Sequence, residues 1–356
     1  MVNVSVQKIN NFFSFFNMKT LIIIGGGFAG SLIAKKLENK FKTILIDTKD
    51  YFEFTPSIVK ALINPNYTKK IQRKHSYYLK NTEIIISKLK HIIGNEILLK
   101  NKQKIKFDYL IIATGTSYHT PFKQSDILIP QRILNIKEQN KKLQNAKSVL
   151  IIGAGIVGIE TALKLHESYK DKEIILVNSR STILERQPKK AQKFIKTYLE
   201  KNKINLFLNE RVISYKDNSY QTDKKTIFKA DFVLAATGIT PNSKFIGQEY
   251  LNTKGFILVD PTLRLKENIF VLGDVNSIRE EKTAQSSEKQ ALLTIKNIVA
   301  LEKNKPLSNY KIKQRPIIIS LGKNKALFIY KNFIFSGFIP GLMKKVIEYK
   351  TLKRYS

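Results

Sequence analysis

The sequence predicts an α/β protein in which one strand–turn–helix unit occurs twice. A glycine-rich turn over residues 25–30 follows the apolar run 21–24, and a second turn over residues 153–158 follows the apolar run 149–152. Both turns have the pattern G-x-G-x-x-G, and both precede a segment with helical periodicity. Such a turn brings backbone close to a pyrophosphate at the N-terminus of the following helix. We therefore expect two Rossmann-like dinucleotide-binding domains.

In the first unit, a helix over residues 29–39 leads to a strand over residues 43–47. Asp47 closes this strand, at a place where a carboxylate accepts hydrogen bonds from the ribose of a bound adenosine. Further strand-like segments follow, and the last of them runs into Ala113-Thr114-Gly115, a tight turn at which backbone can pass close to a cofactor. These segments are 83–87, 96–100 and 107–113.

The second unit repeats this plan with a helix over residues 159–169 and a strand over 173–177. It closes on a strand over 231–236 and the turn Ala236-Thr237-Gly238, which echoes the first Ala-Thr-Gly turn. This internal repeat predicts that the second domain is inserted within the first. The chain then returns to the outer domain through segments 255–260 and 268–272, the pair Gly273-Asp274 and a helical segment over 282–301.

The expected organisation has five parts. An N-terminal extension, expected to be disordered, is followed by the outer domain in two parts with the inserted domain between them, and by a basic, apolar C-terminal region. Their boundaries are 1–17, 18–129, 130–245, 246–306 and 307–356, in that order. Met18 directly precedes the first strand, so it is an alternative start of the chain.

The chain is strongly basic, with 62 Lys and Arg residues against 28 Asp and Glu residues and a formal net charge of +34. Compositional drift explains this excess as well as selection for an anionic partner does, because net charge governs association and not fold. Anionic lipid and an acidic protein both stay open as partners. Nucleic acid is disfavoured, since the sequence contains no recognised nucleic-acid-binding motif.

Cysteine is absent from the sequence. The chain therefore has no redox-active disulfide, no thiolate nucleophile and no cysteine-ligated metal or iron–sulfur cluster. The four histidines lack metal-ligand spacing, so no metal site is expected. No run of about twenty apolar residues is present, which argues against a membrane-spanning helix.

Together, the motifs resemble the two-dinucleotide-binding flavoprotein superfamily of the disulfide reductases, and in particular its cysteine-free branch. That branch includes type II NADH:quinone oxidoreductases and the apoptosis-inducing-factor-like and ferroptosis-suppressor-type quinone reductases. The resemblance extends from about residue 18 to the end of the chain, and it implies FAD in the outer domain and NADH or NADPH as co-substrate in the inserted one. The segments that carry it are 23–30, 112–115, 153–160, 236–242 and 269–274.

The resemblance implies that the FAD pyrophosphate lies at the first glycine turn and that Asp274 binds a ribityl hydroxyl. It also implies that Lys60 lies near the phosphates and that Lys88 contributes backbone contacts near the adenine. A solvated surface position is an equally good interpretation of either lysine on so basic a chain. The residues expected to contact FAD are Gly25, Gly27, Gly30, Asp47, Lys60, Lys88, Thr114, Gly115, Gly273 and Asp274.

The inserted domain departs from the usual NAD pattern at the end of its second strand. Asn178 stands there in place of an acid, followed by Ser179 and Arg180. An acid at this position binds the 2′-hydroxyl of NAD, whereas a nearby arginine accommodates the 2′-phosphate of NADP, so both nucleotides stay open. The residues expected to contact NAD(P)H are Gly153, Gly155, Gly158, Asn178, Arg180 and Gly238.

Three polar side chains are candidates for a part in the reaction. Glu160 matches a family carboxylate that lies near the nicotinamide, where it would position the ring; a favourable place for any carboxylate near a helix start is the alternative. Gln285 and Lys289 match the segment near the quinone in type II enzymes, although a glutamine is usual at the second position. An ordinary polar helix face is the alternative for both.

The C-terminal region has apolar residues at helical spacing after Pro340, with basic residues around them. A short basic amphipathic helix of this kind lies in a bilayer interface, and packing on the protein's own core or in a homodimer interface is the alternative. The apolar residues are Ile339, Leu342, Met343, Val346 and Tyr349, and the basic ones are Lys344, Lys345, Lys350, Lys353 and Arg354.

These expectations favour an FAD-dependent NAD(P)H:quinone oxidoreductase, located in the cytoplasm at a membrane surface. Its quinone or other small electron acceptor would take two electrons after NAD(P)H has reduced the flavin. A soluble reductase of an acidic electron carrier of the rubredoxin or ferredoxin type is the first alternative. A redox-sensing or nucleic-acid-binding flavoprotein is the second, and only the basic charge supports it.

Overall fold

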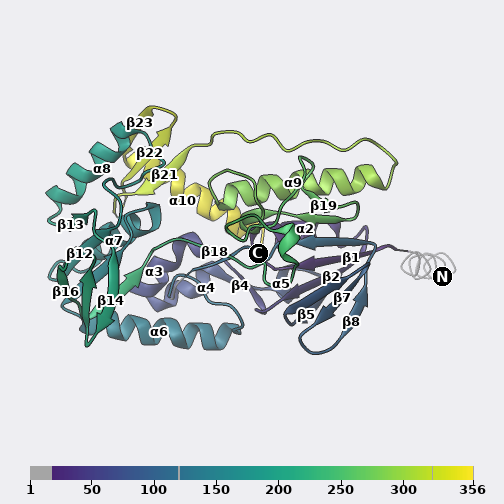
Figure 1. Cartoon of the computed structure of the whole chain (residues 1–356), viewed down its shortest axis with the longest axis horizontal. Helices are drawn as coiled ribbons and strands as arrows, with labels where there is room; N and C mark the ends of the chain where they lie inside the picture. Colours follow the sequence, from purple (N-terminus) through teal and green to yellow (C-terminus); the bar gives the residue numbers. More distant parts are fainter. Residues whose placement is uncertain (1–17, 119–120, 323, 356) are drawn as a thin grey trace, which may run out of the picture.

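The computed structural model describes residues 18–118, 121–322 and 324–355. The expected N-terminal extension, residues 1–17, therefore lies outside the described residues. Two separate sheets organise the chain, one at each end of the molecule in Figure 1.

The larger sheet has six strands in the order β19-β20-β9-β1-β2-β5. The neighbouring strands from β20 to β5 all pair in parallel, and only β19 is antiparallel to its neighbour β20. The central strand β1 is almost wholly buried, as expected for an apolar strand in a parallel sheet that is covered on both faces. The bounds are β1 Thr20–Ile24, β2 Lys42–Asp47, β5 Thr82–Ile86, β9 Tyr109–Ile112, β19 Arg264–Lys266 and β20 Ile269–Val271.

The second sheet has four strands in the order β13-β12-β11-β17, and all of its pairs are parallel. Two helices pack with it, and they lie at the left of Figure 1. The bounds are β11 Ser148–Ile152, β12 Glu173–Asn178, β13 Asn205–Leu208, β17 Phe232–Ala235, α7 Ile156–Ser168 and α8 Lys189–Lys201.

The predicted fold class is confirmed, because each sheet begins with a strand, a glycine turn and a helix, and the second sheet interrupts the first along the chain. Helix α2 (Phe28–Leu37) follows the first turn and packs on α9 (Ala284–Leu301), which the sequence predicts two residues longer at its start. The four boundaries between the five predicted parts stay predictions.

Smaller sheets and short helices surround these two sheets. A three-stranded antiparallel sheet accompanies each of them, and short helices precede the long helix α6. The bounds are β3 Tyr51–Glu53, α3 Ile58–Ile63, α4 Thr68–Ile71, β4 Gln72–Lys74, α5 His75–Tyr78, β6 Leu89–Ile93, β7 Glu96–Leu99, β8 Lys104–Lys106, α6 Ile129–Asn145, β14 Val212–Lys216, β15 Ser219–Thr222 and β16 Ile227–Lys229.

The two halves of the molecule are joined at the Ala-Thr-Gly turns. Strand β10 (Thr116–Ser117) follows the first turn and pairs antiparallel with β18 (Thr240–Pro241), which follows the second. The side chain of Thr114 also donates a hydrogen bond to the carbonyl oxygen of Asn242 at 2.8 Å. The chain therefore enters and leaves the inserted half at adjacent places.

The C-terminal region forms a three-stranded antiparallel sheet and one helix. The strands are β21 (Ile317–Ser320), β22 (Ala326–Tyr330) and β23 (Phe333–Gly337), and helix α10 (Phe338–Lys353) follows without a loop. Figure 1 shows α10 in yellow between the two large sheets. The prediction of a helix start at Pro340 is close, since the helix begins two residues earlier.

Candidate functional site

The first glycine turn is folded as tightly as its pattern predicts. Gly25 has φ of +101°, and a Cβ atom there would overlap the carbonyl group of Ala113. A Cβ atom on Gly30 would overlap the carbonyl oxygen of Gly25. At Gly27, by contrast, no heavy atom lies within 4 Å of the Cβ position, so the space over the turn is open.

The second turn has the same geometry. Gly153 has φ of +107°, a Cβ atom on Gly158 would overlap the carbonyl oxygen of Gly153, and the Cβ position of Gly155 faces open space. Gly27 and Gly155 are the N-cap residues of helices α2 and α7. Neither helix has a side-chain cap or an acidic residue in its first turn. Unpaired N–H groups at such a helix start attract an anion, so both turns fit the pyrophosphate of a dinucleotide.

The residue that ends the second strand of each unit is hydrogen-bonded to the backbone of its glycine turn. The Asp47 carboxylate accepts a hydrogen bond from the Gly26 N–H at 2.9 Å, and the Asn178 side-chain oxygen accepts one from the Ala154 N–H at 3.1 Å. Asn178 also donates to the carbonyl oxygen of Thr182 at 2.9 Å. Its amide group is therefore engaged by its own loop, and its contact with a ribose stays a prediction.

Arg180 lies on that loop with its side chain 67% exposed, and its nearest charged partner is Glu185 at 3.8 Å. The guanidinium group is thus available to a ligand at the end of β12. An exposed pair of this length contributes little stability and can be replaced by a phosphate contact.

Gly273 and Asp274 lie beside the first turn, at the end of β20. Gly273 has φ of +77°, and its N–H donates to the side-chain oxygen of Gln290 at 2.7 Å. The Asp274 carboxylate lies 3.5 Å from the Thr116 hydroxyl and 3.4 Å from the Ser287 hydroxyl, so it is lightly held. The structure thus brings Thr114, Gly115, Gly273 and Asp274 together, while Gly238, with φ of +117°, marks the corresponding turn of the second half.

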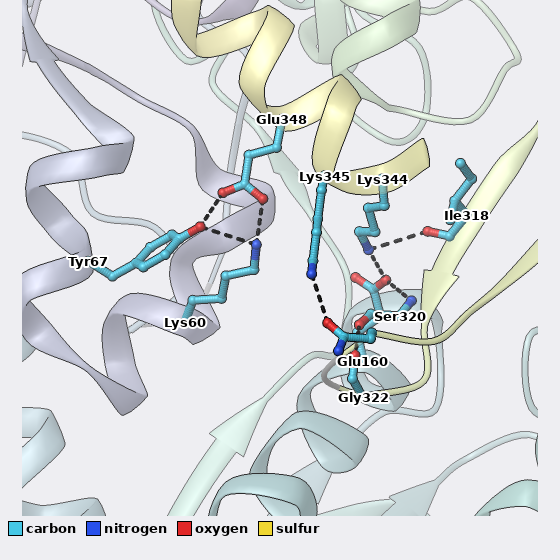
Figure 2. Close-up of polar contacts among 10 residues, drawn as sticks. Lys60, Tyr67, Glu160, Ile318, Ser320, Gly322, Lys344, Lys345 and Glu348 are labelled. Atoms are coloured by element: carbon cyan, nitrogen blue, oxygen red, sulfur yellow. Dashed lines mark hydrogen bonds and ion pairs between the residues drawn. The ribbon is translucent and has the colours of Figure 1, made fainter. Parts of the chain in front are cut away.

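Lys60 and Lys88, the two lysines that the resemblance places near FAD, have different surroundings. Lys60 is half-buried, and its ammonium group lies 2.5 Å from the Glu348 carboxylate of α10 and 3.3 Å from the Tyr67 hydroxyl (Figure 2). Lys88 is 60% exposed, and its ammonium group lies 3.7 Å from Asp126. A cofactor role for either lysine stays a prediction.

Glu160 lies on α7 and is bound by the C-terminal region. Its carboxylate accepts a hydrogen bond from the backbone N–H of Ser320 at 2.6 Å and is paired with the Lys344 ammonium group (Figure 2). Lys344 and Glu348 are one helical turn apart on α10, so they lie on the same face. This face therefore contacts Glu160 of the inserted half and Lys60 of the outer half at once.

The Glu348 carboxyl group is 8% exposed. Burial raises its pKa, but the Lys60 ammonium group and the hydroxyl groups of Tyr67 and Ser57 stabilise the charged form, and the pKa is held below its usual value. The pair is thus an ionised link between α10 and α3.

Gln285 and Lys289 are exposed on α9. Among the described residues, neither is hydrogen-bonded or ion-paired to Glu160. The neighbouring Gln290 is buried and holds Gly273 and Asn276, with the Asn276 side-chain amide donating to its oxygen at 2.7 Å. The roles of Gln285 and Lys289 stay predictions, and Gln290 supports the backbone beside Asp274.

Three residues at the site are absent from the sequence-based expectations for it. The sequence pattern predicts only a basic helix face for Lys344, and it gives His75 no metal-ligand spacing. Lys123 donates a hydrogen bond to the carbonyl oxygen of Thr116 and has no carboxylate partner among the described residues; burial, with the Lys49 charge, lowers its pKa to about 8. No sequence motif marks Lys123, because its burial depends on how the chain folds around it.

Two further observations limit the chemistry. Within the described ranges, no group of three or more His, Cys, Asp and Glu side chains is placed to hold a metal ion. None of the helices that the structure describes is long and apolar enough to cross a membrane.

The fold and the two nucleotide turns define a flavoprotein that takes electrons from a pyridine nucleotide. The family model described as pyridine nucleotide-disulphide oxidoreductase matches residues 19–291, and the chain belongs to this family. It is therefore an oxidoreductase that uses FAD and NAD(P)H, as the sequence motifs predict. The family name refers to a disulphide, which this cysteine-free chain lacks.

Curated relatives agree with the expected branch. The chain is 29% identical over 340 residues to apoptosis-inducing factor homolog B of Dictyostelium discoideum, with 85% of this chain and 87% of that protein covered. It is 27% identical over 326 residues to ferroptosis suppressor protein 1 of Homo sapiens, with 85% and 86% covered.

Solved structures share the fold. The sulfide:quinone oxidoreductase of Aquifex aeolicus superposes with a TM-score of 0.80 at 20% identity and covers 94% of this chain and 92% of its own. NDH2 of Plasmodium falciparum in complex with NADH gives a TM-score of 0.76 at 15% identity, with 95% and 97% covered.

Proposed function

We propose that this chain is an NAD(P)H:quinone oxidoreductase that works at a membrane surface. The observation that carries the proposal is the two-sided helix α10. Its inner face contacts Glu160 and Lys60, while its outer face is an exposed apolar stripe. One helix would thus link a lipid surface with the site of electron transfer.

The exposed stripe consists of the apolar residues that the sequence placed at helical spacing. Packing on the protein's own core does not account for them, since each is more than a third exposed, and Phe333 and Phe338 extend the stripe. Their exposures are Ile339 66%, Leu342 49%, Met343 38%, Val346 40%, Tyr349 64%, Phe333 60% and Phe338 60%. With Lys345, Lys350 and Lys353 on the same helix, the stripe suits an anionic bilayer interface.

When bound, FAD would accept a hydride from NAD(P)H and pass two electrons to the acceptor. The residues of the chain supply position and charge for this transfer. Glu160, held by Lys344 and Ser320, would orient the nicotinamide ring, and the turns at Gly27 and Gly155 would hold the two pyrophosphates. No cysteine is present to receive the electrons, so they would pass to an external acceptor.

Two features support a quinone as that acceptor. A quinone is a lipid, so its reductase must reach the membrane, as the stripe on α10 would permit. The structural relative from Aquifex aeolicus is described as a sulfide:quinone oxidoreductase, which places quinone among the acceptors that this fold serves. Gln285 and Lys289 are exposed on α9, on either side of Glu288, which is ion-paired with Arg354 at 2.7 Å. Both side chains would be available to a quinone head group.

Quinone reduction is tested on the purified flavoprotein by stopped-flow spectroscopy. NADH and NADPH are expected to bleach the flavin absorbance, and a short-chain ubiquinone or menaquinone analogue is expected to restore it rapidly. The ratio of the two bleaching rates would identify the preferred nucleotide. Rapid bleaching followed by slow reoxidation by every quinone, and rapid reoxidation by an acidic ferredoxin or rubredoxin, would overturn the quinone assignment.

Membrane docking is tested by substituting the stripe. Leu342→Asp combined with Val346→Asp is expected to abolish co-sedimentation with liposomes that contain anionic lipid, because two charges would have to enter the interface. Ile213→Asp, at an apolar residue of β14 that is 61% exposed and lies outside the stripe, is the control and is expected to sediment like the unmodified protein. Unchanged sedimentation of the double variant, or its conversion from dimer to monomer without liposomes, would assign the stripe to a different role.

A further inference from the structure

We infer that His75 is a positioning residue of the FAD site, where it holds Asp47 and the first glycine turn in a closed ring of hydrogen bonds. The inference rests on the FAD dependence of the family and is independent of the electron acceptor.

The ring begins and ends on Gly26. The Gly26 N–H donates to Asp47 Oδ2 at 2.9 Å, which lies 3.3 Å from His75 Nε2. His75 Nδ1 lies 2.7 Å from the Tyr78 hydroxyl, which lies 2.7 Å from the Ser31 hydroxyl. Ser31 donates to the carbonyl oxygen of Gly26 at 2.8 Å and closes the ring. All four side chains are at most 9% exposed, so water does not substitute for these bonds.

The direction of the hydrogen bond at Asp47 follows from the charge of its carboxyl group. Burial raises the pKa of Asp47, but the His75 hydrogen bond and the Lys49 charge outweigh burial and keep this pKa below its usual value. Asp47 is therefore an acceptor, and the Nε2–H group of His75 donates to its carboxylate.

This arrangement decides which part of Asp47 can meet a ligand. A carboxylate has about four acceptor positions. Gly26 and His75 occupy Oδ2, and the Thr48 N–H, at 2.7 Å, occupies one position of Oδ1. The remaining position of Oδ1 is free for a hydroxyl of the adenosine ribose. His75 thus turns a flexible two-oxygen group into one oriented acceptor.

The ring also explains the residue at a position that the motif leaves variable. A Cβ atom on Gly26 would lie 2.5 Å from His75 Nε2 and 2.7 Å from Asp47 Oδ2, so only glycine leaves room for the imidazole ring. The equivalent residue of the second turn is Ala154, whose N–H donates to the neutral Asn178 amide and whose carbonyl oxygen accepts from the Leu184 N–H at 3.0 Å. The first turn is therefore held by a ring of buried side chains and a carboxylate, as suits a nucleotide that stays bound, whereas the second is held by one neutral side chain and the backbone of its own loop, as suits a co-substrate that must leave after each turnover.

The test compares FAD with FMN, which lacks the adenosine. His75→Phe keeps a ring of similar size and removes both ring nitrogens, so FAD is expected to be released faster from diluted holoenzyme. After reconstitution, the Kd of the variant for FAD is expected to rise roughly 5- to 100-fold, because a buried hydrogen bond to a charged group is lost. The Kd of the variant for FMN is expected to stay unchanged. His91→Phe, at an exposed histidine of β6, is the matched control. Flavin fluorescence reports each quantity without any electron acceptor.

A double-mutant cycle separates positioning from general packing. If His75 acts through Asp47, His75→Phe adds little to the loss of FAD affinity in an Asp47→Asn background. Tyr78→Phe, which opens the ring and keeps the imidazole, is expected to give a smaller, equally FAD-specific loss, and it carries the comparison if His75→Phe fails to fold. Equal losses of FAD and FMN affinity, additive losses in the cycle, or unchanged FAD affinity in both variants would overturn the inference.

Discussion

A Gly158→Ala variant is expected to purify with bound FAD and to be reduced by neither NADH nor NADPH. The added Cβ atom would overlap the carbonyl oxygen of Gly153, so the turn and α7 would have to separate and the second pyrophosphate site would be lost. The first turn lies in the other sheet and is untouched. Flavin absorbance of the purified variant and its anaerobic bleaching by each nucleotide measure the two properties separately.

The matched variant is Gly30→Ala, in which the Cβ atom would overlap the carbonyl oxygen of Gly25. It is expected to purify without FAD. The pair therefore assigns one turn to each dinucleotide. Loss of FAD from Gly158→Ala, or full nucleotide-dependent bleaching of that variant, would contradict the assignment.

The second large effect is expected from Lys344→Met. The substitution removes the ammonium group that pairs with the Glu160 carboxylate and leaves the Ser320 N–H as the remaining hydrogen-bond donor. Removing one partner from a largely buried charge costs about 1–3 kcal/mol, so flavin reduction by saturating NAD(P)H should slow roughly 5- to 150-fold. Stopped-flow bleaching measures this rate directly.

The adjacent lysine provides the control for that experiment. Lys345 donates a hydrogen bond to the side-chain oxygen of Asn324 at 2.8 Å, whereas Glu160 is paired with Lys344, so Lys345→Met is expected to bleach at the unmodified rate. Both variants remove one positive charge from α10, and they therefore change membrane attraction alike. Equal bleaching rates in the two variants would show that Lys344 has no role in hydride transfer.

The nucleotide turns could be predicted from the sequence because their requirements are local. Gly30 is glycine since a Cβ atom there would overlap the carbonyl oxygen of Gly25, five residues earlier, and such spacing is visible in a single line of sequence. Asp47 and Asn178 were found in the same way, as the ends of strands at a fixed distance from each turn. The apolar stripe of α10 was also predicted, because its helical period does not depend on what the helix contacts.

The remaining site residues could not be predicted, because contacts across long stretches of chain define them. Lys344 is 184 residues from Glu160, and Glu348 is 288 residues from Lys60. His75 has no metal-binding pattern around it, and its importance follows only from its burial against Asp47. The basic residues of α10 illustrate the difficulty: as a pattern they are alike, and in the structure Lys344 faces inward while Lys345 does not.

The order of strands in the larger sheet has a consequence for dissecting the protein. Strand β9, with all four of its residues buried, pairs with β20, which the chain reaches only after the whole inserted half. A fragment that stops before β11 would expose β9 as a bare apolar edge, a template for aggregation. The inserted half, by contrast, is entered and left through strands that pair with each other. Its sheet is built from one continuous stretch of chain, so a fragment with these two ends would keep every strand pair of that sheet.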